Sequence, residues 1–269
     1  MNTPFSSNQW ALILGGSSGF GLATARKLAR HGMSLGLAHR DRRGAMRGIE
    51  QQFDELRGWG TSVLTLNENA LTPEGREAIL DALSARIGPE GRVRLLLHSI
   101  AAGNLKPLVA ASAGESCLEE EDFAQTIHAM GSSLVGWTQA LFTRGLFDAD
   151  ARVIGLTSEG SQVAWPGYAA VSAAKATLEA AARAIAAELG PHGIRCNVVQ
   201  AGVALTPALE RIPGHERMIA SARGRNPLGR LTTPEDVADV IYLLTLDEAR
   251  WVNGAVLRVD GGERIAAGP

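Results

Sequence analysis

Three features are scarce in this chain of 269 residues, and each scarcity excludes a class of protein. Only two cysteines are present, Cys117 and Cys196, which are too few for a disulfide-based scaffold. Glycine or a charged residue interrupts every apolar run before it reaches the roughly 18–20 residues that a bilayer span needs. The formal net charge is -2, from 26 basic and 28 acidic side chains, which argues against a nucleic-acid-binding protein and against a polybasic membrane surface.

The remaining composition is that of a globular protein. Hydrophobic residues make up 45% of the chain and charged residues 20%, so enough apolar surface is available for a sizeable core and disorder is not expected. Residues 1–8 contain no basic segment followed by an apolar core, so no signal peptide is expected. We therefore expect a soluble cytoplasmic protein. Since no linker, repeat or low-complexity segment interrupts the chain, we expect a single domain over residues 1–269.

Short apolar runs alternate along the chain with longer helical stretches. The alternation predicts a doubly wound α/β Rossmann domain, in which a parallel sheet of about seven strands carries helices on both faces. The expected strands cover residues 11–14, 35–38, 63–66, 93–98, 152–156, 194–199 and 255–259. The expected helices cover residues 22–31, 49–56, 74–87, 123–142, 168–189 and 234–246, the last of them capped by Thr232 or Thr233.

A glycine-rich stretch joins the first expected strand to the first expected helix. Such a turn lets the backbone approach a dinucleotide's diphosphate, and the start of the helix offers free N–H groups to an anion. We therefore predict a cofactor-binding turn. Its predicted cofactor-binding residues are Gly15, Ser17, Ser18, Gly19, Phe20 and Gly21.

The end of the second expected strand predicts which nicotinamide cofactor is bound. An acid at this point receives a ribose 2′-hydroxyl, whereas a basic residue accommodates a 2′-phosphate. The first charged residue here is Arg40, and a guanidinium can hold a phosphate with two hydrogen bonds. We therefore predict NADPH rather than NADH. The alternative is a solvated basic turn in which Asp41 contacts the ribose.

Tyr168 and Lys175 are two turns apart on an expected helix, so their side chains share one face. Their Cα atoms are expected to lie roughly 10 Å apart, a distance that the nicotinamide ribose could bridge. Lys175 would hold the ribose hydroxyls, and its charge would favour a tyrosine that shares its proton. We predict that both residues are catalytic; the alternative is an ordinary pair on an amphipathic helix.

The sequence resembles the short-chain dehydrogenase/reductase superfamily over nearly its full length. The resemblance rests on the glycine-rich turn and on matches at residues 197–202, Thr206, residues 226–230 and residues 259–262. It implies cofactor contacts and a homotetramer built on the long helices. The contacts fall on Asn69 and Ala70, which face the adenine ring, on Ser99, Ile100 and Ala101, on Lys175, and on Thr206.

Most members of the superfamily carry Tyr-x3-Lys, but Val171 occupies that tyrosine position here. The Tyr-x6-Lys spacing resembles the enoyl-acyl-carrier-protein reductases of bacterial fatty-acid synthesis, as do the stretches at residues 98–101 and 175–180. In enoyl reduction the hydride lands two carbons from the carbonyl, so the group that stabilises the enolate oxygen must reach further from the nicotinamide. Moving the tyrosine back three helical residues displaces its Cα by roughly 4.5 Å. We therefore predict NADPH-dependent reduction of an enoyl thioester, carried on acyl-carrier protein or CoA, with Tyr168 donating a hydrogen bond to the thioester oxygen.

One position departs from the enoyl reductases. They usually carry an aromatic residue ten positions before the main tyrosine, whereas this chain has Ser158, at the place where ketone-reducing relatives carry a catalytic serine. Ser158 either orients a carbonyl or is a plain loop serine. Reduction of a 3-oxoacyl thioester or another ketone therefore stays open as the alternative function, and a non-catalytic nucleotide sensor is a third.

Residues 203–230 interrupt the alternation of strands and helices. This stretch combines apolar residues with five arginines, and we predict a long irregular lid over the substrate, with the arginines binding the phosphates of a pantetheine carrier. The alternative is a disordered charged loop. The six histidines show no metal-ligand spacing, so no metal is expected.

Overall fold

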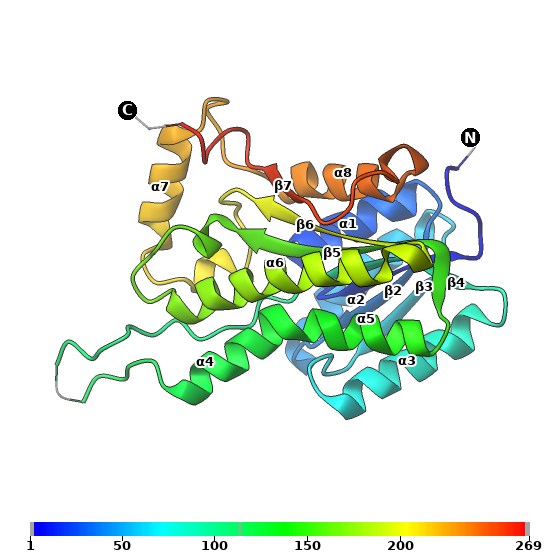
Figure 1. Cartoon of the computed structure of the whole chain (residues 1–269), viewed down its shortest axis with the longest axis horizontal. Coiled ribbons are helices and arrows are strands. Elements are labelled where there is room, and N and C mark those ends of the chain that lie inside the picture. Colours follow the sequence, from blue (N-terminus) through cyan, green and yellow to red (C-terminus); the bar gives the residue numbers. More distant parts are fainter. Residues whose placement is uncertain (1–2, 113, 267–269) are drawn as a thin grey trace.

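A computed structural model describes residues 3–112 and 114–266 of the protein, and seven of its strands form one parallel sheet (Figure 1). The strand order is β3-β2-β1-β4-β5-β6-β7. From β1 the first strands are added toward one edge of the sheet and the later strands toward the other, as in a doubly wound fold. The predicted Rossmann sheet is thus confirmed. The strands are β1 (Gln9–Leu14), β2 (Ser34–His39), β3 (Val63–Asn67), β4 (Arg92–His98), β5 (Phe147–Ser158), β6 (Ile194–Ala201) and β7 (Val256–Val259).

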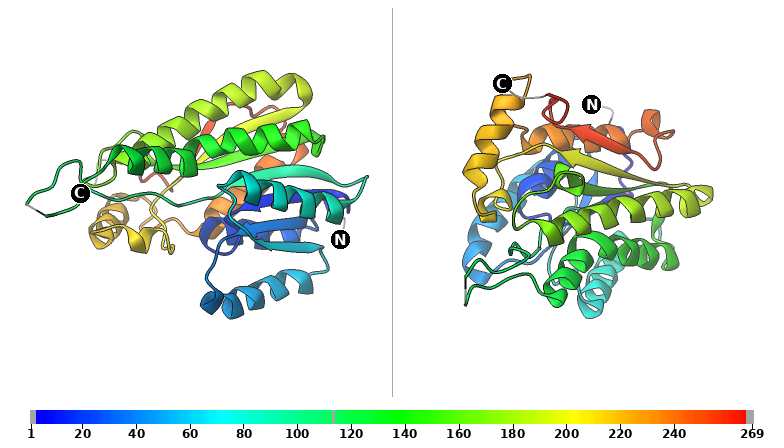
Figure 2. Two further views of the ribbon diagram at one scale, coloured as in Figure 1. Left: turned by 90° about the horizontal axis from the view of Figure 1, so that it is seen from below. Right: turned by 60° about the vertical axis from the view of Figure 1, so that its left-hand side comes forward.

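Helices cover both faces of the sheet, as Figures 1 and 2 show. One apolar core lies between the sheet and α1, α2 and α8, and a second lies between the sheet and α3, α5 and α6. Because both faces are covered, the central strands are buried on each side and are apolar throughout rather than alternating. The helices are α1 (Gly19–Arg30), α2 (Met46–Gly58), α3 (Pro73–Ile87), α4 (Glu120–Ile127), α5 (Ser133–Thr143), α6 (Ala169–Leu189), α7 (His215–Arg225) and α8 (Pro234–Thr245).

The expected helix over residues 123–142 is two helices in the structure. A π-helical turn, His128–Ser132, separates α4 from α5. Gly131 lies in this turn, where a Cβ atom would come within 2.8 Å of the carbonyl oxygen of Ala174 on α6. The turn therefore packs closely against the backbone of α6, a tertiary contact that apolar spacing does not reveal.

The lid expected over residues 203–230 is not irregular throughout. It contains the short 3-10 turn Leu209–Arg211 and the helix α7. Of the α7 residues only Ala222 is buried, so this helix has no apolar stripe that a sequence pattern could detect. At the end of the lid, Thr233 caps α8 reciprocally with Asp236, which confirms one of the two expected caps.

A cluster of arginines stabilises the amino edge of the sheet, opposite the ends where the strands finish. Asp150 contacts Arg94 (2.6 Å), Arg152 (2.8 Å) and Arg195. Arg94 and Arg152 are buried and also donate hydrogen bonds of 2.9 Å to carbonyl oxygens in the last turn of α8. Burial opposes ionisation of Asp150, but the hydrogen bonds and charges of Arg152 and Arg94 lower its pKa to about 2.

Candidate active site

A cavity of about 800 Å³ opens at the carboxyl ends of the strands. Ligands of doubly wound sheets bind at this edge, near the point where the strand order reverses. The cavity wall combines the ends of β5 and β6, the loop after β4, the π-helical turn and the lid. Sequence-predicted residues in the wall are Phe20, Arg40, Asn69, Ala101, Ser158, Tyr168 and Thr206.

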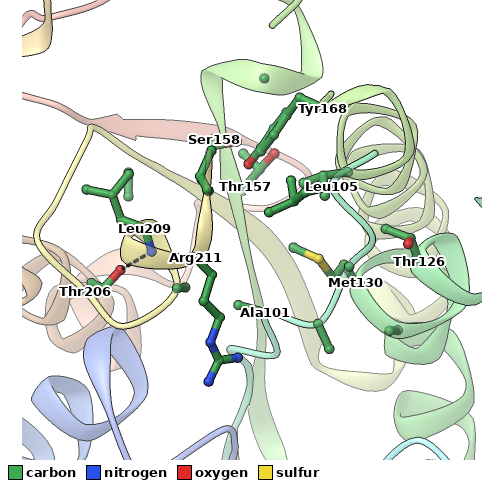
Figure 3. A pocket seen from close by; sticks show the side chains of 18 of the residues that line it. Ala101, Leu105, Thr126, Met130, Thr157, Ser158, Tyr168, Thr206, Leu209 and Arg211 are labelled. Carbon is green, nitrogen blue, oxygen red and sulfur yellow. Dashed lines mark hydrogen bonds between the residues drawn. The ribbon is translucent and has the colours of Figure 1, made fainter. Parts of the chain in front are cut away.

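Ser158 and Tyr168 lie at the same end of this cavity (Figure 3). Ser158 ends β5, and Tyr168 directly precedes α6 with its backbone N–H donating to Trp165 O at 3.1 Å. Burial raises the pKa of Tyr168, the nearby Ser158 hydroxyl acts in the opposite direction, and the charge of Glu159 raises it further. The two hydroxyls do not form a well-aligned hydrogen bond, and Ser158 Oγ has no other partner among the described residues. The site therefore contains the protonated phenol of Tyr168 and a Ser158 hydroxyl that can hydrogen-bond to a ligand.

Lys175 lies behind the cavity wall rather than in it. Its side chain is buried, and Nζ donates a hydrogen bond of 2.7 Å to the carbonyl oxygen of Leu156 on β5. Burial lowers the pKa of Lys175 to about 8, although the charge of Glu179 acts in the opposite direction. The structure thus fixes Lys175 against the strand that carries Ser158. Its contact with a ribose stays a prediction.

The glycine-rich turn is shaped by close backbone contacts. Gly15 has φ +89°, and a Cβ atom there would lie 2.5 Å from Ser99 O. At Gly21 a Cβ atom would lie 2.1 Å from Gly15 O, so neither position tolerates a side chain. A Cβ atom on Gly19 would be 3.6 Å from Thr206, which places the turn beside the lid. Ser17 and Ser18 lie in the same turn, Ser18 as the N-cap of α1, and Phe20 is the second residue of that helix. The turn therefore has the shape that lets a dinucleotide's diphosphate lie against the protein backbone.

Two charged residues at the end of β2, Arg40 and Asp41, differ in their contact with the cavity. Arg40 lines the cavity and makes no ion pair with any described residue. Asp41 does not line it; its carboxylate lies 3.0 Å from Nδ1 of His39, and its backbone N–H donates to Asn67. The carboxylate is therefore engaged away from the cavity, while the guanidinium of Arg40 is available to a ligand.

Two further groups of predicted cofactor residues are only partly exposed to the cavity. Asn69 lines it, but Ala70 packs on the core and its carbonyl oxygen accepts a 2.9 Å hydrogen bond from Trp137. Ala101 lines it, but Ser99 does not and is bonded through its backbone N–H to Leu14 at 2.9 Å. Ile100 packs against the core. Ala70, Ser99 and Ile100 therefore adjoin the wall without lining the cavity.

The lid contributes differently from the prediction. Leu209, Ile212 and Met218 line the cavity, as expected for residues that receive an acyl chain, but only one lid arginine, Arg211, lines it. Arg225 is bonded to Glu159 (2.5 Å) and Glu263 (2.9 Å).

Some cavity residues had no sequence signal of their own. Glu159 adjoins Ser158 in the sequence, and Glu263 follows the matched stretch at 259–262, so proximity to motifs could have indicated both. Gln200 lies within the matched stretch at 197–202, whereas Trp165, which also lines the cavity, offered no such signal.

No cluster of histidine, cysteine, aspartate and glutamate suited to a metal ion occurs within residues 3–112 and 114–266. Over the same residues, no helix has the length and apolar character needed to cross a membrane.

The strand order, the glycine-rich turn and the cavity at the strand ends define a Rossmann protein with a dinucleotide site. A family model described as enoyl-(acyl carrier protein) reductase matches residues 15–263. The protein therefore belongs to this family, within the short-chain dehydrogenases/reductases, and is an oxidoreductase.

Named relatives are similar over nearly the whole chain. 1-Cyclohexenylcarbonyl-CoA reductase of Streptomyces collinus is 30% identical, over 100% of this chain and 93% of that protein. (3R)-3-Hydroxyacyl-CoA dehydrogenase of Canis lupus familiaris is 29% identical, over 94% of this chain and 95% of that protein. The structure of enoyl-[acyl-carrier-protein] reductase (NADH) from Aquifex aeolicus superposes with a TM-score of 0.81 at 25% identity, covering 96% of this chain and 97% of that one. The relatives thus include both enoyl and hydroxyacyl chemistry.

Proposed function

We propose that the protein reduces the carbon–carbon double bond of an enoyl thioester, carried on CoA or acyl-carrier protein, with NADPH. The observation that carries the proposal is the position of the only phenol at the cavity. The chain has two tyrosines, and Tyr242 stacks on His31 with ring centroids 4.2 Å apart, outside the cavity. At the Tyr-x3-Lys position Val171 is 4% exposed and packs in an apolar cluster. These observations support Tyr168 as the donor, at the longer spacing that we expect for enoyl reduction.

The surroundings of the Tyr168 phenol favour its role as a hydrogen-bond donor to an enolate. Tyr168 would donate its O–H to the thioester oxygen as negative charge develops there. Burial and Glu159 raise its pKa, so the phenol keeps its proton at neutral pH and acts as a donor. Apolar lid residues such as Leu209 and Met218 would exclude water from the acyl group.

The turn at Gly15–Gly21 and the free guanidinium of Arg40 fit NADPH. When bound, this cofactor supplies the hydride. Arg40 would pair with the 2′-phosphate, because Asp41 is held by His39 and is not placed to receive a 2′-hydroxyl. Lys175 would hold the ribose. A homotetramer and an acyl-carrier protein as partner remain part of the proposal.

One observation favours ketone reduction as the second candidate. Ser158 Oγ is buried at the same end of the cavity as Tyr168 and has no hydrogen-bond partner among the described residues, as expected for a hydroxyl that orients a carbonyl. NADPH oxidation measured in parallel with crotonyl-CoA and acetoacetyl-CoA separates the two candidates. Turnover of crotonyl-CoA supports the proposal, whereas turnover of acetoacetyl-CoA alone would replace it with ketone reduction.

A further inference from the structure

Arg211 differs from the paired arginines of the lid. Arg225 and Arg230 are bonded to carboxylates, Arg230 to Asp236 at 2.6 Å. Arg211 makes no ion pair and no side-chain hydrogen bond with any described residue, and its side chain lines the cavity (Figure 3). A guanidinium keeps its charge at every physiological pH and offers five N–H donors. A free guanidinium in a cavity wall is suited to an anionic ligand.

The backbone around Arg211 is anchored beside the glycine-rich turn. Leu209 N donates to Thr206 Oγ1 at 3.2 Å, drawn as a dashed line in Figure 3, and Glu210 N donates to Thr206 O at 3.2 Å. Leu209 is 7% exposed, so the 3-10 turn that carries Arg211 is held by packing as well as by hydrogen bonds. Thr206 lies next to Gly19, where an added Cβ atom would be 3.6 Å from the threonine side chain. Arg211 thus extends from a fixed turn that adjoins the predicted diphosphate site.

The side chain of Arg211 points away from the reacting end of the cavity. In Figure 3 its guanidinium extends away from Tyr168 and Ser158, on the side where Ala101 lies. Two residues before Ala101, the carbonyl oxygen of Ser99 lies next to Gly15 of the glycine-rich turn. This direction leads to the half of the cavity that adjoins the glycine-rich turn, so the anion that suits Arg211 is not the reacting acyl group.

We propose that Arg211 binds the diphosphate of the nicotinamide cofactor from the lid. The inference rests on the part of the proposed function that assigns a nicotinamide dinucleotide, and it is independent of whether an alkene or a ketone is reduced. Both NADH and NADPH carry the diphosphate, so Arg211 contributes affinity without discriminating between them, whereas Arg40 discriminates.

Arg211→Gln tests the assignment, with Arg217→Gln as the matched control. Arg217 is an exposed arginine of α7 that does not line the cavity and has no ion pair among the described residues. Dissociation constants for NADPH and NADH are measured by calorimetry without thioester, so the result does not depend on turnover. Arg211→Gln is expected to raise both constants by the same factor, roughly ten- to a hundredfold for the loss of charge-assisted hydrogen bonds. Arg217→Gln is expected to change neither, and both variants are expected to keep the wild-type melting temperature.

A second arm separates cofactor phosphates from those of the thioester carrier. The KM values of crotonyl-CoA and of crotonyl-N-acetylcysteamine, which has no phosphate, are compared in the wild type and in Arg211→Gln at saturating NADPH. Equal effects on the two thioesters support the assignment. Unchanged cofactor dissociation constants would overturn it, and if KM then rose for crotonyl-CoA alone, Arg211 would bind the carrier's phosphates instead. Failure of the enoyl assignment would appear separately, as loss of crotonyl turnover in the wild type with cofactor binding intact.

Discussion

Lys175 Nζ donates a hydrogen bond of 2.7 Å to the backbone carbonyl oxygen of Leu156. This bond joins α6 to β5 two residues before Ser158. Since α6 begins directly after Tyr168, the lysine fixes the helix that positions the phenol against the strand that positions the serine. A buried ammonium in this place combines a structural role with an electrostatic one.

The pKa of Lys175 predicts a pH dependence of activity. Burial lowers it from 10.5 to about 8, so the ammonium loses its charge above pH about 8. We expect kcat/KM to fall above that pH, because a neutral amine forms weaker hydrogen bonds with the ribose hydroxyls and no longer stabilises the enolate by its charge. Tyr168 does not account for the fall, since its pKa is raised. Lys175→Arg, which stays charged, is expected to remove the fall; a wild-type profile flat to pH 10 would contradict this.

The same shift affects stability with a defined sign. The pKa of Lys175 is lower in the folded state, so between pH about 8 and 10.5 the unfolded chain binds the extra proton. The burial of this charge therefore costs stability below pH 8, and the cost is relieved as the pH rises through that window. Urea unfolding of the wild type and Lys175→Met at pH 7 and pH 9.5 measures this contribution. The stability difference between the two proteins is expected to shift in favour of the wild type at the higher pH.

Replacement of Tyr168 by phenylalanine removes the proposed enolate donor. Loss of one such donor costs roughly a hundred- to a thousandfold in kcat. We expect that loss with crotonyl-CoA, whereas Ser158→Ala is expected to cost less than about tenfold because the serine is not the principal donor. Tyr242→Phe is the matched control, since this ring lies on α8 against Phe5 and His31. Equal losses in Tyr168→Phe and Ser158→Ala would point to ketone chemistry.

Arg40 is expected to determine the choice of cofactor. Arg40→Ala should raise the KM of NADPH much more than that of NADH, because only NADPH carries the 2′-phosphate. Asp41→Asn should leave both nearly unchanged, since the carboxylate is engaged by His39. Arg86→Ala, at an exposed arginine of α3, is the control. Equal effects of Arg40→Ala on the two cofactors would remove the NADPH assignment.

Asp150 is expected to stabilise the fold without affecting catalysis, because it lies at the opposite edge of the sheet from the cavity. Asp150→Asn leaves the buried guanidinium groups of Arg94 and Arg152 without their shared carboxylate, which is expected to cost about 3–5 kcal/mol in the free energy of unfolding. Asp247, 80% exposed beside the same Arg94, provides the control, since Asp247→Asn should cost about 1 kcal/mol or less. Urea unfolding measures both. A small effect of Asp150→Asn would show that solvent replaces the carboxylate.

The pKa of Asp150 adds a test with acid. It is lowered from 3.8 to about 2, so the stability that it contributes is present above pH 3.8 and is lost as the pH falls from 3.8 to 2. Asp150→Asn is therefore expected to show a weaker dependence of stability on pH over that interval than the wild type.

The sequence predicted the sheet because its central strands are buried on both faces and read as unbroken apolar runs, such as residues 11–14. It also indicated the glycine-rich turn, Arg40, Ser158 and Tyr168, since each follows the end of a strand or begins a helix. It did not predict the π-helical turn at Gly131 or the helix α7, because one depends on contact with α6 and the other has almost no buried face. The sequence did not predict how the lid arginines differ, since only three-dimensional contacts distinguish Arg225, paired with Glu159 and Glu263, from Arg211, which has no ion pair within residues 3–112 and 114–266.

The position at which hydride enters the substrate tests the central claim most directly. Crotonyl-CoA is reduced with NADPH deuterated at C4, in separate reactions for the two faces of the nicotinamide, and the product is analysed by NMR. Enoyl reduction predicts butyryl-CoA with deuterium on the β-carbon and a solvent proton on the α-carbon, formed by the wild type and by Tyr242→Phe at similar rates and by Tyr168→Phe roughly a hundred- to a thousandfold more slowly. No label in butyryl-CoA from either face, together with deuterated 3-hydroxybutyryl-CoA from acetoacetyl-CoA, would contradict the account and identify a ketone reductase.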